Sequence, residues 1–217
     1  MTLTGSCHMG VSLRTLIYIP IMHTHTDMGE LGDSVQRVTV QKLGVKAWRH
    51  KMRAIEQMWA QIERVVEAIR LHYGRVHLYQ DGLPICGRED EIVRQLADRG
   101  SRNHRLLHRL MEKGATLMGT ESGDLLLEEY ERVKLSAGAT SRSRMKSPRS
   151  GGKDPDDTLL QRRDRFIAHR INTTLQPGET GILFLGMLHN LEHLLDQDIQ
   201  IICPISQPDQ PGGKSNG

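Results

Sequence analysis

Short apolar segments in this chain alternate with segments of helical periodicity, and four of the apolar segments end at an ionisable residue. The four clearest apolar runs span residues 16–22, 76–80, 115–120 and 182–188, and a fifth follows at 199–203. A short apolar run bounded by turn residues is typical of a buried strand, and strands that alternate with helices form βαβ units. The sequence therefore predicts an α/β fold with a largely parallel central sheet and helices on both faces.

The length of 217 residues is enough for one domain with a proper core. The hydrophobic fraction is only 37%, and the deficit is concentrated in a few segments that cannot bury enough surface to offset the entropy of ordering them. We expect a single α/β domain over residues 14–206, with disordered segments at 1–13, 137–156 and 207–217. The segment 137–156 is rich in Ser and Arg, and it is interpreted as a solvated insertion rather than as an RNA-binding element.

The clearest helix signal is a stripe of large apolar residues spaced alternately by four and three positions. Its members are Trp48, Met52, Ile55, Trp59, Ile62, Val66 and Ile69. This spacing predicts a long amphipathic helix packed on the sheet. A coiled-coil seam has the same spacing, so a homodimer contact through Trp48 and Trp59 is the alternative. The preceding residues 23–44 are expected to form a polar turn region.

Composition and motifs exclude several classes of function. The formal charge of +3 gives little support to nucleic-acid or anionic-membrane binding. The sequence has no apolar stretch of about 20 residues and no signal-peptide pattern, so we expect a soluble cytoplasmic protein without membrane contact. Three widely spaced cysteines (Cys7, Cys86 and Cys203) suit reduced thiols. No phosphate-binding loop or dinucleotide-binding glycine motif occurs, so no nucleotide or flavin cofactor is expected.

Chemically active residue types stand where the predicted strands end. His23 and Asp27 follow the first strand, Asp81 the second, Glu121 the third and His189 the fourth. The carboxyl ends of parallel strands lie along one edge of a sheet, where open α/β folds bind ligands. We therefore expect two imidazoles and three carboxylates to share one crevice.

This combination of side chains suits a divalent metal. Imidazole and carboxylate ligands bind Zn, Mn or Fe, and we assign the ligand role to His23, Asp27 and His189. The ordinary alternative is that both histidines belong to a loop and that Asp27 caps a turn.

The remaining charged groups fit roles beside such a metal. Asp81 or Glu121 could act as general base on a bound water, although Asp81 also suits a turn and Glu121 the first turn of a helix. Arg163, in the charged run 162–165, could stabilise a developing oxyanion or bind an anionic substrate group. A solvated charge run is the alternative explanation of these arginines.

Two segments near the C-terminus carry a resemblance to a known group of proteins. Residues 163–168 read RDRFIA, and the later apolar strand ends in Gly186-Met187-Leu188-His189. Together they resemble the C-terminal part of the TraB/Tiki and erythromycin-esterase/ChaN-like superfamily. Its members share paired Gly-x-x-His motifs, an arginine and a glutamate on a fold with a central sheet, and several are proposed to be metal-dependent proteases or esterases.

The resemblance implies that His23 and His189 are the two motif histidines. It also implies that Asp81 or Glu121 takes the acidic role and Arg163 the basic one. Our functional hypothesis is a metal-dependent hydrolase acting on a small-molecule or peptide substrate. The alternative is a non-enzymatic small-molecule-binding or regulatory protein that dimerises through the Trp48/Trp59 helix and holds a small anionic metabolite.

Overall fold

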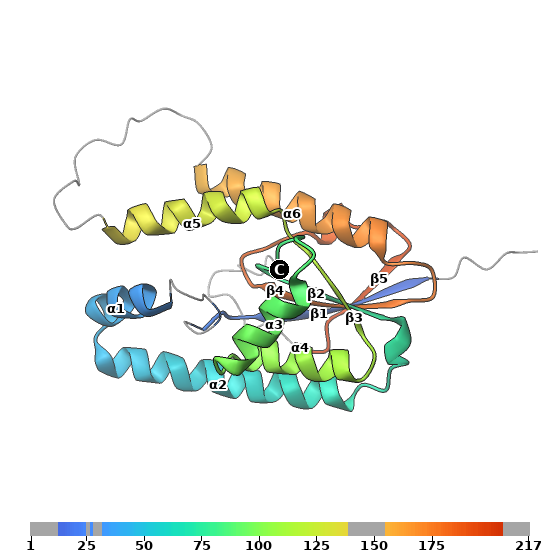
Figure 1. Cartoon of the computed structure of the whole chain (residues 1–217), viewed down its shortest axis with the longest axis horizontal. Helices are drawn as coiled ribbons and strands as arrows, with labels where there is room; N and C mark the ends of the chain where they lie inside the picture. The colour runs from blue at the N-terminus through green and yellow to red at the C-terminus, as the bar shows by residue number, and fades with distance from the viewer. Residues whose placement is uncertain (1–12, 25–26, 28–31, 139–154, 206–217) are drawn as a thin grey trace, which may run out of the picture.

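A five-stranded, all-parallel sheet forms the centre of the molecule (Figure 1). The computed structural model describes residues 13–24, 27, 32–138 and 155–205. The strands are β1 (Arg14–Ile21), β2 (Val76–Gln80), β3 (Thr116–Met118), β4 (Thr180–Gly186) and β5 (Ile199–Ile202). Their order across the sheet is β3-β2-β4-β1-β5. The predicted α/β class and parallel sheet are confirmed.

The strand β4 lies between β1 and β2, which do not pair with each other. Its register with β1 runs from Thr15↔Thr180 to Ile21↔Gly186, and its register with β2 ends at Gln80↔Phe184. The carboxyl ends of these three strands are therefore neighbours at one edge of the sheet. Asp81 follows β2 directly, whereas His23 and His189 follow β1 and β4 within three residues.

Helices cover both faces of the sheet (Figure 1). They are α1 (Gly32–Leu43), α2 (Val45–Ala68), α3 (Glu89–Asp98), α4 (Arg102–Glu112), α5 (Gly123–Gly138) and α6 (Pro155–Thr174), with short 3-10 turns η2 (Tyr73–Arg75) and η3 (Glu192–Leu194). Side chains from α2, α3 and α4 pack on one face, and side chains from α6 pack on the other. None of the helices in these described ranges is both long and apolar enough to cross a bilayer.

The core divides into two parts because alternate residues of a strand point to opposite faces. In β1, Ile17, Ile19 and Ile21 belong to the cluster under α2, whereas Leu16 and Tyr18 belong to the cluster under α6. Strands buried on both faces need an almost continuous apolar sequence. This requirement explains why β1 and β4 were recognisable from the sequence.

The predicted apolar stripe of α2 faces the sheet. Ile55, Trp59, Ile62 and Val66 are its buried residues, and the indole nitrogen of Trp59 donates a hydrogen bond to the carbonyl of Met22 at 3.3 Å. Trp59 is 1% exposed and serves this chain's own core, so it cannot form an exposed dimer seam. Trp48 is half-buried. A homodimer contact through the remaining surface of the Trp48/Trp59 helix stays a prediction.

The prediction of a polar turn region over residues 23–44 was wrong for its second half, which forms α1. The segment 32–43 contains three valines and one threonine, which have modest helix propensity, and α1 packs against α2. The contact with α2 therefore stabilises a helix that the local propensity of these residues does not favour. The predicted disordered segments lie almost entirely outside the described residues, except that α5 and α6 extend to residues 138 and 155 at the borders of the predicted insertion.

Candidate functional site

Arg163 of α6 is the centre of a buried ionic cluster at the carboxyl edge of the sheet. Its Nε and Nη2 donate to the two carboxylate oxygens of Glu121 at 2.7 and 2.6 Å. Nη2 also donates to Asp81 Oδ1 at 2.8 Å, and Nη1 donates to Glu129 at 2.6 Å. The residue is 5% exposed. Burial alone would lower the pKa of the guanidinium, but Glu121 and Asp81 raise it above its ordinary value, so Arg163 remains charged.

Glu121 holds Arg163 in place. It follows β3, is 1% exposed, and its Oε1 also accepts the backbone N–H of Gly82 at 2.8 Å. Burial raises the pKa of this carboxyl group, although Arg163 opposes the rise. Because both oxygens are occupied, this geometry favours a positioning role for Glu121 over the general-base role expected from the sequence.

Asp81 connects Arg163 to the two histidines. Its Oδ2 accepts the backbone N–H of Gly186 and lies 2.9 Å from Nε2 of His23 and 3.7 Å from Nε2 of His189. Burial would raise the pKa of Asp81, but His23, His189 and Arg163 together lower it below its usual range. Asp81 is therefore the ionised acceptor for its neighbours.

Each histidine is oriented by a carboxylate. His23 Nε2–H donates to Asp81, which leaves Nδ1 as the nitrogen that can accept a proton. His189 Nδ1 lies 2.5 Å from Asp164 Oδ1, and an Nδ1–H donor leaves Nε2 as the acceptor. Asp164 is itself fixed by the backbone N–H of Asn190 at 3.1 Å.

Solvent reaches the two rings to different degrees. The side chain of His23 is 35% exposed, whereas that of His189 is buried. Burial lowers the pKa of His23, but the hydrogen bond and charge of Asp81 outweigh it, so the pKa lies above its ordinary value. His23 is thus the imidazole best placed to exchange protons with water.

Gly186 lets these groups approach each other. A Cβ at this position would lie 2.8 Å from Asp81 Oδ2 and 3.9 Å from His23 Nε2. Since real Cβ atoms do not approach other atoms as closely as 2.8 Å, any side chain here would displace the Asp81 carboxylate.

Asp27 has different partners from those expected. Its Oδ2 accepts the N–H and the hydroxyl of Thr24 at 2.6 and 2.8 Å, and its Oδ1 accepts the hydroxyl of Ser101, the N-cap of α4. His104 lies 3.8 Å away. Burial raises the pKa of Asp27, but the nearby imidazole of His104 and the hydrogen bonds from Ser101 and Thr24 lower it to about 2. Asp27 therefore fixes the loop after His23 to α4.

The structure brings together five of the six predicted site residues: His23, Asp81, Glu121, Arg163 and His189. Asp27 bonds elsewhere, so the expected ligand set is not assembled. In the part of the chain that the structure describes, no group of three or more His, Cys, Asp or Glu side chains is arranged to hold a metal ion.

Sequence reasoning missed Asp164 and Gly186 as site residues. Asp164 is hidden in the charged run 162–165, where any residue could be solvated, and only its neighbour Arg163 was selected. The Gly-x-x-His spacing did include Gly186 but gave no reason for the glycine.

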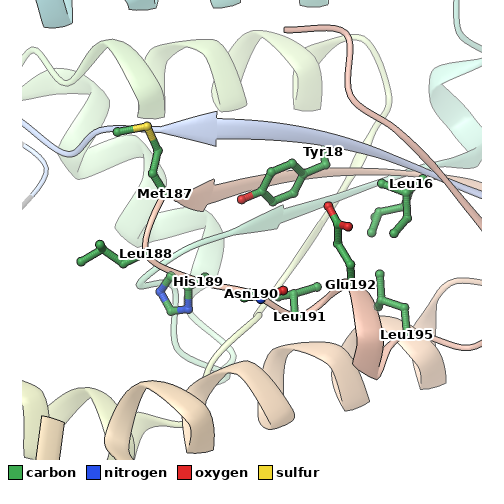
Figure 2. Close-up of a pocket in the computed structure, with 10 residues that line it drawn as sticks. Leu16, Tyr18, Met187, Leu188, His189, Asn190, Leu191, Glu192 and Leu195 are labelled. Carbon is green, nitrogen blue, oxygen red and sulfur yellow. The ribbon is translucent and has the colours of Figure 1, made fainter. Parts of the chain in front are cut away.

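A pocket of about 370 Å³ adjoins His189 (Figure 2). It lies between β1 and the segment that follows β4, and its wall combines polar groups, which make up the larger part of the lining surface, with apolar side chains. Its lining includes Leu16, Tyr18, His189, Leu191, Glu192 and Leu195. His189 thus belongs both to the ionic cluster and to the pocket.

The fold and the cluster define this chain as an α/β protein with a His/carboxylate site at the carboxyl edge of a parallel sheet. No protein-family model, curated protein or solved structure matches the chain. The resemblance to the TraB/Tiki and erythromycin-esterase/ChaN-like superfamily stays a prediction.

Proposed function

We propose that this chain is a hydrolase whose reacting groups are the imidazoles of His23 and His189. The observation that carries the proposal is the convergence of both Nε2 atoms on one oxygen of Asp81, within 2.9 and 3.7 Å. Two strands bring these rings together from distant parts of the sequence. One imidazole would be enough to form a structural ion pair with Asp81, whereas acid–base catalysis can use two imidazoles.

His23 is the proposed general base. Asp81 raises its pKa, and general bases are most effective when their pKa lies near the operating pH. The free Nδ1 would take a proton from water as the water oxygen attacks the substrate, and the same proton would then pass to the leaving group.

His189 has the complementary role at the edge of the pocket. With Nδ1–H held by Asp164, its Nε2 would bind and orient the substrate beside the attacking water. Arg163 already donates to three carboxylates, so we assign it charge compensation rather than direct contact with an oxyanion.

A metal-assisted version of the same reaction is the second candidate. Within the cluster, the three buried carboxyl groups of Asp81, Glu121 and Asp164 outnumber the buried guanidinium of Arg163, and a buried surplus of negative charge favours a bound cation or protonated imidazoles. The hydrogen bond from His189 to Asp164 is also the usual outer contact of a metal-bound histidine. Because His23 and Asp81 are in direct contact, the ion would have to replace their shared proton. A bound Zn, Mn or Fe ion would supply an activated water.

Hydrolysis can be tested with a panel of chromogenic esters and amides. We expect His23→Gln and His189→Gln to lower kcat/KM by about 10²- to 10⁴-fold. His108→Gln, on α4 and outside the cluster, is the control and should keep full activity. The hydrolase proposal fails if the unchanged protein cleaves no member of the panel, or if both site variants are as active as the control.

Metal content decides between the two versions. Untagged protein is compared with a His23→Ala/His189→Ala double variant and with His108→Ala. Metal assistance predicts about one equivalent of metal per chain in the unchanged protein and in the control, with a loss in the double variant. Equal metal content in all three proteins would reject the metal-assisted version.

A further inference from the structure

The pocket beside His189 has the size of a small-ligand site. Its volume of about 370 Å³ is within the usual range of about 300 to 1,000 Å³ for such sites. Leu16, Leu191, Leu195 and Ile201 supply apolar walls. Polar groups, among them Tyr18, His189 and Glu192, supply the larger part of the lining surface, so the mixed lining suits a ligand that joins an apolar part to a polar or charged group.

Tyr18 places an unpaired hydroxyl at this pocket. The residue is 7% exposed, and within the described residues its hydroxyl has no hydrogen-bond partner. Figure 2 shows the ring beside the pocket, with the hydroxyl pointing along β1 toward the Met187–His189 segment. Burial, together with nearby groups such as Cys203 and Glu192, raises the pKa of Tyr18 to about 12. The phenol is therefore neutral and can bond to a ligand.

Glu192 gives the pocket a negative charge. Its side chain extends from η3 toward Tyr18 and Leu16 (Figure 2). No Lys or Arg is among the residues that line the pocket, so no lysine or arginine side chain in the lining offsets the charge of Glu192. A negative pocket without a cation attracts a positive ligand group and repels an anion.

We propose that this pocket binds a substrate with an apolar body and a positively charged amine or guanidine group. The cation would lie beside Glu192, the apolar body would lie against Leu191 and Leu195, and Tyr18 would donate or accept one hydrogen bond. The placement of the scissile bond near His189 rests on the proposed function, but the binding preference does not. The same charge pattern disfavours the small anionic metabolite that the sequence suggested as an alternative ligand.

A matched series of six-carbon probes tests the preference without turnover. Hexylamine, hexan-1-ol and hexanoate share one apolar body and differ in charge. Binding of each is followed by amide chemical shifts in ¹H–¹⁵N spectra. We expect hexylamine to bind most tightly and hexanoate most weakly, with the largest shifts at Tyr18, His189 and Leu191.

Variants identify the groups responsible. Glu192→Gln should weaken hexylamine binding about two- to five-fold, as expected for a solvent-exposed ion pair, and should leave hexan-1-ol binding unchanged. Glu56→Gln on α2, across the sheet from the pocket, is the control and should change neither. Tyr18→Phe removes only the hydroxyl and should weaken hexan-1-ol binding.

The proposal is overturned if hexanoate binds as tightly as hexylamine, or if the hexylamine shifts map away from the pocket. The His23→Gln variant separates this result from the hydrolase proposal, because it should bind hexylamine normally while lacking activity. Normal hexylamine binding by a protein that cleaves no test substrate would refute the hydrolase and leave the cation pocket in place.

Discussion

The two histidines of the site meet at Asp81 because the last residue of β4 has no side chain. Gly186 contributes its backbone N–H to Asp81 Oδ2 and leaves free the space that a methyl group would occupy. One glycine thus determines the distance between three chemically active side chains.

Gly186→Ala should destabilise the protein by about 1–3 kcal/mol, because its Cβ would collide with the buried Asp81 carboxylate. Urea unfolding measures the loss. Gly123→Ala, where a Cβ meets nothing within 4 Å, is the control and should change stability by less than about 0.5 kcal/mol. Equal effects of the two substitutions would contradict the close packing at Gly186.

Asp164→Asn should change which nitrogen of His189 carries the proton. A carboxylate stabilises the Nδ1–H form more strongly than an amide does, so the ratio of the two neutral tautomers should fall about ten-fold. Long-range ¹H–¹⁵N spectra of the imidazole report this ratio directly. Asp124→Asn, an exposed position on α5, should leave it unchanged, and an unaltered ratio in Asp164→Asn would remove the orienting role.

Residue types at strand ends predicted most of the cluster, because parallel strands must finish at a common edge. They did not predict the partners of each group. Glu121 and Arg163 were chosen as free catalytic groups but compensate each other's charge, and Asp27 follows β1 closely yet turns toward Ser101. Such pairings depend on tertiary geometry, which residue type and spacing do not specify.

At the scale of elements, the loop that carries His23 is fastened to the start of α4 by Asp27. The folded state keeps this carboxyl ionised down to a pKa of about 2, whereas its ordinary value is 3.8. The unfolded chain therefore binds more protons between these values, and stability falls as the pH drops through this window.

Asp27→Asn should remove this dependence. The stability advantage of the unchanged protein over the variant should shrink by about 2 kcal/mol between pH 5 and pH 2, as measured by urea unfolding at several pH values. The exposed Asp98→Asn on α3 serves as control and should retain the pH dependence of the unchanged protein. A constant difference between Asp27→Asn and the unchanged protein would show that Asp27 is not held as described.

Trp59→Ala should cost about 3–5 kcal/mol because it empties a core position between α2 and the sheet. Trp48→Ala, at a half-buried position on the same helix, should cost only about 1 kcal/mol. Chemical denaturation distinguishes the two. A Trp59→Glu protein that stayed folded and became monomeric would instead support the dimer seam.

The elements with strong periodicity were predictable for a simple reason. Helix α2 repeats its apolar residues over six turns, and β1 and β4 are apolar on both faces. Helix α1 has no such signal in its own sequence and depends on its contact with α2. The spacing of apolar residues therefore predicted α2, β1 and β4, which form the core, but did not predict α1, which lies at the margin of the core.

For the molecule as a whole, the α/β class followed from alternation, but the strand order did not. The alternation of strands and helices implies crossover connections but does not determine which strands become neighbours. The position of β4 between β1 and β2 was therefore known only from the structure. That position is what places His189 beside Asp81 and His23.

Arg163→Met should destabilise the whole domain by about 3–5 kcal/mol, because it leaves the buried carboxylates of Asp81 and Glu121 without their cation. Thermal and urea unfolding measure the effect. Arg162→Met, at the exposed neighbouring position, is the matched control and should change stability by about 0.5 kcal/mol or less. Adding Glu121→Gln to Arg163→Met should restore part of the loss, and no recovery would argue against charge compensation as the role of Arg163.

The place of β4 also has a consequence for synthesis. Until residues 180–186 leave the ribosome, β1 has none of its partner strands and β2 has only β3. His23, Asp81, Glu121 and Arg163 are all translated before the strand that aligns them. In a nascent chain at that stage, the edges of β1 and β2 that later pair with β4 have no partner. Unpaired strand edges of this kind are prone to aggregation and are bound by chaperones.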